Sequence, residues 1–146
     1  MSAHKFELLI IFGTIILAIA FVVTALNPAA RRREARNTAR TAAVDTILSA
    51  IHQYVLSTGS VPPEINSIAS QIGTCTTGGN VLCPNASSVC IDLSTILSSG
   101  EYLKSNPLDP LSGTASSTGY AISRDVNNVF TVSACQAEGL SINHSR

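Results

Sequence analysis

Four cysteines in the second half of the chain carry its most distinctive chemistry. They are Cys75, Cys83, Cys90 and Cys135, separated by 7, 6 and 44 residues. Their spacing does not match a zinc site, and none of the three histidines lies near them, so we expect neither a metal nor a cofactor. An even number of cysteines in a small segment rich in Ser, Thr and Gly is typical of disulfides formed outside the cytoplasm.

The sequence alone does not choose among the three connectivities that four cysteines allow. We favour Cys75–Cys83, which closes a short loop, together with Cys90–Cys135, which ties residues 89–93 to the last predicted strand. The alternative is Cys83–Cys90 with Cys75–Cys135.

No other set of side chains suggests catalysis. The acids Asp92, Glu101, Asp109 and Asp125 are scattered, and no Gly-rich loop follows a strand and opens a helix. We therefore expect no catalytic residue and no enzymatic activity. Asp109 lies between two prolines, where we expect it to cap a turn. The alternative is a Ca²⁺ ligand, although the neighbouring segment 112–118 contains no acid.

Basic residues gather before residue 41. Residues 1–40 carry six Lys and Arg against two acids, whereas residues 41–146 carry three against seven, which gives net charges of +4 and −4. Five of the six are arginines within residues 31–40. Such a cluster could pair with the acidic part of a neighbouring copy, lie solvated beside a membrane, or neutralise nucleic-acid phosphates.

An almost unbroken apolar run, LLIIFGTIILAIAFVVTAL, precedes these arginines at residues 8–26. As an α-helix it would span roughly 28 Å, about the thickness of a bilayer core, and it is too long for the apolar region of a secretory signal peptide. A permanent anchor and a helix later moved into a filament core both fit. Glu7, directly before the run, favours the second, because a carboxylate there is costly unless paired. Alternatively, Glu7 lies at the headgroup level beside the helix N-terminus.

The arginines and the cysteines predict opposite orientations. Five arginines follow the apolar run and only Lys5 precedes it, which by the positive-inside rule places the C-terminal part in the cytoplasm. Disulfides place it outside. We follow the cysteines and expect the C-terminal part to be exported.

An amphipathic helix is expected over residues 31–58, so that residues 1–58 form a stem. Its apolar residues recur at helical spacing, at Val44, Ile47, Leu48, Ile51, Tyr54 and Val55, with His52 on the polar face. Gly59 should end the helix. Pro28 should bend or interrupt the stem near residues 24–28, because proline cannot donate a backbone hydrogen bond.

The remaining residues, 59–146, should form a disulfide-bonded globular head. We expect a short helix over residues 63–73 and either a strand or a helical turn at residues 89–93. The segments GYAISR and VFTVSAC alternate apolar and polar residues around a turn, which predicts a β-hairpin. Residues 139–146 should form a tail.

The stretches ELLIIFGTIILAIAFVVTALNPA, RRREARNTART and AVDTILSAIHQYVLSTGSVP, with the later pattern CIDLS, DP, GYAISRD and TVSAC, resemble type IV pilin-like proteins, in particular pilins of small-genome bacterial lineages. The resemblance covers nearly the whole chain and is most specific in its N-terminal part. It implies an α+β fold, in which a long N-terminal helix carries a small head with a short antiparallel sheet. One feature departs from the family: Lys5, not Gly, precedes Phe6, so the usual prepilin peptidase junction is missing. With Glu7 in the family's acid position, the processed chain would begin near Ala3.

The resemblance also implies a function. Residues 8–55 would polymerise into a filament, with Phe6, Glu7 and Pro28 as assembly residues, and the filament would support adhesion, twitching motility or DNA uptake. The implied partners are other copies of the chain, the inner membrane before assembly, the pilus assembly machinery, and host or other surfaces. The chain would move from the inner membrane to an extracellular filament. One alternative is a pseudopilin of a type II secretion system, because LKSNPLDP followed by TGYAIS is similar to a calcium-holding region of such proteins. Another is a monomeric, membrane-anchored surface protein.

Overall fold

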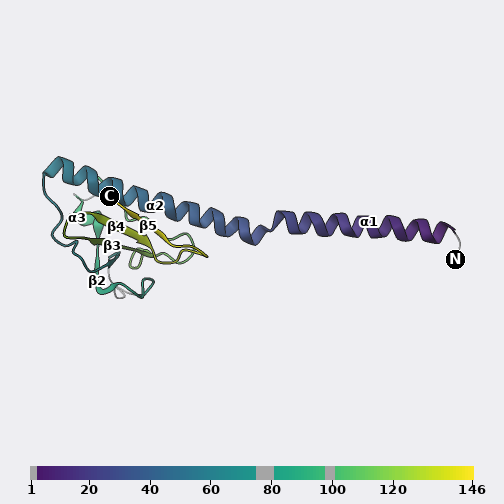
Figure 1. The fold of residues 1–146 in the computed structure, drawn as a ribbon. Helices are drawn as coiled ribbons and strands as arrows, with labels where there is room; N and C mark the ends of the chain where they lie inside the picture. Colours follow the sequence, from purple (N-terminus) through teal and green to yellow (C-terminus); the bar gives the residue numbers. More distant parts are fainter. Residues whose placement is uncertain (1–2, 75–80, 98–100) are drawn as a thin grey trace. The chain divides into compact units, whose positions relative to one another are not determined.

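The computed structural model describes residues 3–74, 81–97 and 101–146. The element order is α1 (Ala3–Leu26), α2 (Pro28–Thr58), β1 (Ser70–Ile72), β2 (Ser87–Ile91), α3 (Leu93–Ile96), β3 (Tyr120–Arg124), β4 (Phe130–Ala134) and β5 (Ile142–Ser145) (Figure 1). This long N-terminal helical segment followed by a sheet-containing head confirms the predicted α+β, pilin-like fold class.

The chain divides into two compact units, Met1–Ala35 and Arg36–Arg146. The second unit, which holds the sheet, begins at Arg36, inside the stem predicted at residues 1–58. Most of α2 belongs to this unit, because side chains of α2 form part of its core.

Within this unit α2 lies along one face of the sheet (Figure 1). Val44, Ile47 and Ile51 are fully buried there, and they belong to the same core cluster as strand residues such as Ile122 and Val132. The apolar stripe predicted from helical spacing is therefore confirmed. His52, expected on the polar face, is half-buried instead: its ring makes an edge contact with Phe130, and its Nε2 is buried without a hydrogen-bond partner among the described residues.

Helices α1 and α2 each end where a local sequence signal predicts it. Gly59 has φ +68°, and its amide donates to the carbonyl of Val55 over 2.9 Å, which ends α2 as predicted. The chain also leaves the helix at Asn27, between α1 and α2, which confirms the predicted interruption near Pro28.

The described residues form a five-stranded sheet of order β2-β1-β3-β4-β5. β1 and β2 are parallel, whereas the other neighbours are antiparallel. β3 and β4 form the predicted hairpin, in register from Tyr120↔Ala134 to Arg124↔Phe130. Asn128 takes the positive φ of +63° in its turn, as the Asn-Asn sequence allows.

The short helix predicted at residues 63–73 is wrong. Turns lead there into β1, whose buried Ser70 and Gln71 pair with β2 on one side and β3 on the other. The isoleucines that suggested helical spacing do not share a face, because Ile68 is 64% exposed whereas Ile65 is fully buried. At residues 89–93 both alternatives occur, since β2 is followed at once by α3, which is capped by Asp92.

The tail predicted at residues 139–146 is also wrong, because β5 completes the sheet beside β4. Ile142 is buried, and Arg146 exchanges two backbone hydrogen bonds with Phe130, of 2.7 and 2.9 Å. His144 Nδ1 lies 2.7 Å from Asp45 Oδ1 on α2. The strand was missed because it lies at an edge, where its other side chains are mostly exposed and polar.

The predicted disulfide pairing is wrong as well. Cys83 is bonded to Cys135, with a Cα–Cα distance of 5.1 Å, and this pair occurs in neither of the two connectivities considered from the sequence. Cys90 is also disulfide-bonded, and Cys75 lies outside the described residues. The bond joins the segment before β2 to the end of β4, across 52 positions. A loop of that length corresponds to about 4 kcal/mol in the chain-entropy model.

Candidate functional site

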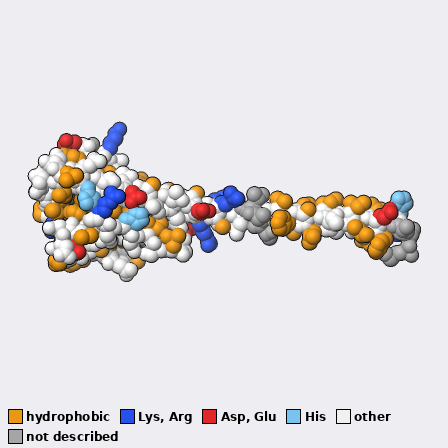
Figure 2. Space-filling view, turned by 45° about the horizontal axis from the view of Figure 1, so that its top comes forward, with side chains coloured by type: hydrophobic (Ala, Val, Ile, Leu, Met, Phe, Trp, Pro, Cys, Tyr) orange, Lys and Arg blue, Asp and Glu red, His pale blue; other side chains and the backbone are white. Residues whose placement is uncertain are grey.

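The surface of α1 is the first candidate site. Every described side chain from residue 4 to residue 23 is exposed, including Leu17 and Phe21, each 74% exposed. Figure 2 shows these apolar side chains along the helix. Among the described residues, the chain has one helical segment long and apolar enough to cross a membrane, by length and composition. A helix that is apolar on every side needs lipid or other protein around it.

Two predicted assembly residues, Phe6 and Glu7, lie side by side near the start of α1. Phe6 is 59% exposed, and Glu7 Oε2 lies 3.4 Å from Nδ1 of His4 on the preceding turn. Both side chains of this pair are mostly exposed. This pairing of His4 with Glu7 was not predicted, although a spacing of three residues places the two side chains on one helix face. The role of Phe6 and Glu7 in assembly stays a prediction.

Pro28, the third predicted assembly residue, lies at the opposite end of α1 and opens α2. Asn27, with φ +20°, caps α2: its Oδ1 accepts from the Ala30 amide over 3.3 Å, and its carbonyl accepts from the Arg31 amide over 3.2 Å. Pro28 therefore takes the first helical position, where its missing N–H costs nothing. The proline both interrupts one helix and starts the next.

The second candidate site is a network of five residues that we call the stem clamp. Three come from α2, Arg36, Asn37 and Arg40, and two come from the head, Asp109 and Glu138. Arg36 and Asn37 precede Arg40 by four and three positions, so both side chains lie beside that of Arg40 on the helix surface. Arg40 is fully buried, and Asp109 is 3% exposed.

Both arginines of the clamp bind a carboxylate through two nitrogens. Arg36 donates from Nε and Nη2 to the two oxygens of Glu138, over 2.6 and 2.7 Å. Arg40 donates from Nε and Nη2 to the two oxygens of Asp109, over 2.6 and 3.2 Å. The Nη1 of Arg40 also reaches Glu138 Oε2 at 3.1 Å and Asn37 Oδ1 at 2.9 Å. Bidentate, charge-assisted pairs of this kind are the strongest hydrogen bonds that side chains make.

Asn37 adds a contact to the backbone of the head. Its Nδ2 donates to the carbonyl of Glu138 over 2.9 Å, and its Oδ1 accepts from the Glu138 amide over 3.1 Å. The amide group thus pairs with one residue of the β4–β5 connection as a neighbouring strand would. This fixes the position of the connection as well as that of the Glu138 side chain.

A tight turn holds Asp109 in place. Its Oδ1 accepts from the amides of Leu111 and Ser112, over 2.9 and 3.1 Å, which confirms the predicted turn cap. Two glycines leave room for it: a Cβ on Gly113 would lie 2.3 Å from the Asp109 nitrogen, and one on Gly119, where φ is +85°, would lie 2.8 Å from the Asp109 Cβ. Because Arg40 occupies both oxygens, the Ca²⁺ alternative loses its main carboxylate.

The clamp holds its acids in the charged form. Burial alone would raise the pKa of Asp109, but the hydrogen bonds from Arg40 and the turn amides outweigh it and lower that pKa. The hydrogen bond from Arg36 lowers the pKa of Glu138 to about 2. Nearby, burial and then the charge of Asp109 raise the pKa of Tyr120 to about 12. The Tyr120 hydroxyl is buried without a hydrogen-bond partner among the described residues.

The sequence did not predict the clamp, although several of its members stand out. The arginines of residues 31–40 form one basic stretch in the sequence, and Asp109 is one of several scattered acids. The available signal was the spacing of Arg36, Asn37 and Arg40, which puts three polar groups on the helix face that also carries the apolar stripe. Polar groups on a core-facing stripe need buried partners.

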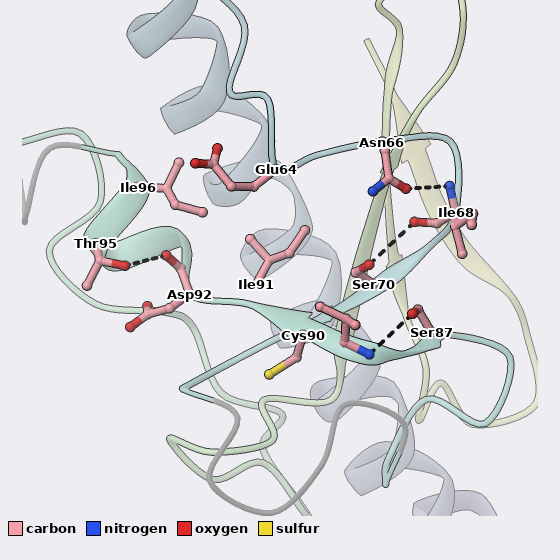
Figure 3. A pocket seen from close by; sticks show the side chains of 11 residues that line it. Glu64, Asn66, Ile68, Ser70, Ser87, Cys90, Ile91, Asp92, Thr95 and Ile96 are labelled. Carbon is pink, nitrogen blue, oxygen red and sulfur yellow. Dashed lines mark hydrogen bonds between the residues drawn. The ribbon is translucent and has the colours of Figure 1, made fainter.

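A groove beside the edge strand β2 is the third candidate site (Figure 3). Its volume is about 550 Å³, and its lining combines Ile68, Ile91 and Ile96 with the carboxylates of Glu64 and Asp92. Figure 3 shows the Glu64 side chain reaching across the groove toward Ile96. Asp92 is already engaged by the cap of α3, where it also accepts from Asn106. The lining would favour a group that is partly apolar and cationic.

Comparisons of the chain with protein-family models, with curated proteins and with solved structures found no match.

Proposed function

We propose that this chain is the structural subunit of a type IV pilus-like filament, polymerising through its N-terminal helix. In this role the subunit is first inserted in the inner membrane. The pilus assembly machinery then transfers it into an extracellular filament, in which its head is exposed. The filament would support adhesion to host or other surfaces, twitching motility or DNA uptake. The role requires no catalytic residue.

The observation that carries the proposal is the exposed apolar surface of α1. Thirteen large apolar residues between Phe6 and Val23 are exposed. Burying each one is worth about 1.5–3 kcal/mol, so their transfer out of water is worth on the order of 20–40 kcal/mol. Lipid and a bundle of identical helices both supply that burial, so a helix of this kind can move from a membrane to a filament core.

Glu7 fits a filament better than a permanent anchor. A carboxylate that enters an apolar helix bundle needs a cationic partner. In a homopolymer, the N-terminal amine of a neighbouring copy would supply it. A permanent anchor does not need an acid at this position.

The stem clamp supports the same role mechanically. Five side chains tie the start of the second unit's helix to the loop at Asp109 and to the β4–β5 connection at Glu138. A head that is held at two points on its own helix would follow the helix into an assembly. The type II pseudopilin alternative shares this architecture, but its calcium-holding region would need Asp109, which binds Arg40 instead.

The proposal is tested by counting surface fibres made by cells that carry Glu7→Ala. We expect few or no fibres, with membrane insertion unchanged, because the helix remains apolar enough to insert. Glu64→Ala is the matched control, since it removes an exposed carboxylate from the head and should leave fibre number unchanged. Mass spectrometry of the subunit N-terminus would show where the processed chain begins.

Two results would contradict the proposal. If cells with Glu7→Ala make a normal number of fibres, Glu7 has no role in assembly. If the unaltered chain inserts and is exported but makes no fibres, the filament proposal is wrong and the monomeric, membrane-anchored protein is the remaining interpretation.

A further inference from the structure

Three arginines remain unexplained once the stem clamp is understood. Five arginines lie within residues 31–40, shortly after α1, and two of them, Arg36 and Arg40, bind Glu138 and Asp109. The other three are Arg31, Arg32 and Arg33, which are exposed and form no ion pair with any residue that the structure describes. Their charge opposes export of the head, because basic residues beside a span favour the cytoplasmic side. A compensating interaction is therefore expected.

Their position relative to α1 indicates where that interaction lies. Arg31 comes five positions after Leu26, the last residue of α1, a separation of about 7.5 Å at the helical rise. The headgroup layer on each side of a bilayer core is about 5–7 Å thick. With α1 across the membrane, the three guanidinium groups would lie at the level of the lipid phosphates.

The arrangement around the helix axis distinguishes a membrane from a one-sided partner. Successive helical residues differ in direction by about 100°, so Arg31, Arg32 and Arg33 point over roughly 200° of the circumference. Figure 2 shows basic side chains projecting from opposite sides of the stem next to α1. A DNA duplex or a single protein face would contact one side of the stem. A lipid leaflet surrounds it.

We propose that Arg31, Arg32 and Arg33 form a collar that binds the phosphate headgroups of anionic lipids around the inserted stem. Guanidinium groups bind phosphate oxygens in a bidentate manner, so each arginine can hold one headgroup. The collar would fix the depth of α1 in the leaflet and hold the subunit until assembly replaces the lipids. This inference rests on the inserted state that the proposed function requires.

The test measures lipid selectivity of the full chain reconstituted in vesicles of phosphatidylcholine containing a minority of phosphatidylglycerol. Spin-labelled versions of both lipids report how strongly each associates with the protein. We expect a preference for phosphatidylglycerol on the order of three- to fivefold, falling toward one in R31Q/R32Q/R33Q. The preference should also fall at about 1 M salt, where the screening length is about 3 Å.

Two control variants make the test specific. K104Q/R124Q/R146Q removes the same number of positive charges, all of them from the head, and should keep the preference. R31K/R32K/R33K retains the charge at the collar and should keep most of it. Neither set touches the stem clamp, so the unfolding midpoint of the head serves as a check on folding.

Four outcomes would overturn the inference. The unaltered chain shows no lipid preference; R31Q/R32Q/R33Q keeps it; the head control loses it equally; or the unaltered chain does not insert into vesicles. Loss of duplex-DNA binding, or of binding between copies, in R31Q/R32Q/R33Q with lipid preference unchanged would assign the arginines to those partners instead. Failure of the filament proposal is distinguishable, because fibre counts would fall to zero while lipid preference persisted.

Discussion

The two compact units of this chain differ in how far their apolar helical side chains are buried. In the first unit, α1 exposes all its described side chains, with Ile16 at 65% exposure. In the second, α2 buries an apolar stripe completely, with Ile47 at 0%. Both segments are helical, but α1 is apolar around its whole circumference, whereas α2 carries its apolar residues on one stripe. The apolar stripe of α2 is therefore buried within its own chain, whereas the apolar surface of α1 needs lipid or another chain to cover it.

The arginines of residues 31–40 also divide into those with partners in the same chain and those without. Arg36 and Arg40 bind carboxylates within their own unit, whereas Arg31, Arg32 and Arg33 form no ion pair with any residue that the structure describes. The basic stretch that looks uniform in the sequence thus has two parts, one structural and one available for external contacts. Changes on each side of the boundary at Arg36 should therefore have different effects.

The largest effect is expected from breaking the buried pair with Arg40→Ala. It leaves the Asp109 carboxylate buried without a cation, so the free energy of unfolding should fall by about 3–5 kcal/mol. Chemical denaturation of the full chain in detergent micelles, followed by near-UV circular dichroism, measures it. Arg32→Ala is the control and should have no measurable effect. A loss below about 1 kcal/mol in Arg40→Ala would mean that the pair does not anchor the head.

Replacing both Arg40 and Asp109 tests whether the loss of stability comes from the unpaired carboxylate. Arg40→Met with Asp109→Leu removes the two charges together, and apolar replacements of buried pairs are often neutral. We expect the double variant to be more stable than Arg40→Ala alone.

A matched pair of isoleucines compares the two helices directly. Ile47→Ala should reduce the free energy of unfolding of the head by about 2–5 kcal/mol, because it opens a cavity in a packed core. Ile16→Ala removes the same atoms from α1 and should leave that free energy unchanged. Denaturation curves of both variants in the same micelles provide the measurement, and equal losses would show that α1 is part of the folded core.

The effect of acid should be smaller, and Glu138 of the clamp should contribute to it. The folded-state pKa of Glu138 is about 2, well below its ordinary value of 4.5. Its contribution is therefore fully present above pH 4.5 and is lost as the pH falls toward 2. The melting temperature should decrease over that window, and less so in Glu138→Gln. An identical pH profile in the variant would exclude Glu138 as a source of the decrease.

The smallest expected effect has the opposite sign. Tyr120→Phe removes a buried hydroxyl that has no hydrogen-bond partner among the described residues. Relief of that unpaired group should leave stability unchanged or raise it by up to about 1 kcal/mol. Tyr54→Phe serves as the control on α2. A loss above about 1 kcal/mol in Tyr120→Phe would indicate that the hydroxyl is paired in solution, for example by a bound water.

The features that local patterns encode were predictable. The apolar run 8–26, the stripe from Val44 to Val55, the interruption near Pro28 and the β3–β4 hairpin each follow from residue spacing or from a single residue's backbone chemistry. These signals extend over a few turns or a few strand residues, so they need no knowledge of distant contacts.

Strands β1 and β5 were not predictable in this way. β1 has three residues, and its stability comes from pairing with β2 and β3 on its two sides. β5 is polar apart from Ile142, and only its pairing with β4 defines it as a strand. Sheet propensity depends on the neighbours of a strand, and these neighbours are distant in sequence.

The apolar run at residues 8–26 is enough to predict a helix that needs partners outside the chain, because water does not solvate an all-apolar helix. The pairing of charges and cysteines inside the head follows from the folded structure. Arg40 meets Asp109 across 69 positions, and Cys83 meets Cys135 across 52. Such pairings depend on how the sheet places its loops against α2. Composition and spacing set the number of possible pairs, but the folded backbone brings one combination within bonding distance.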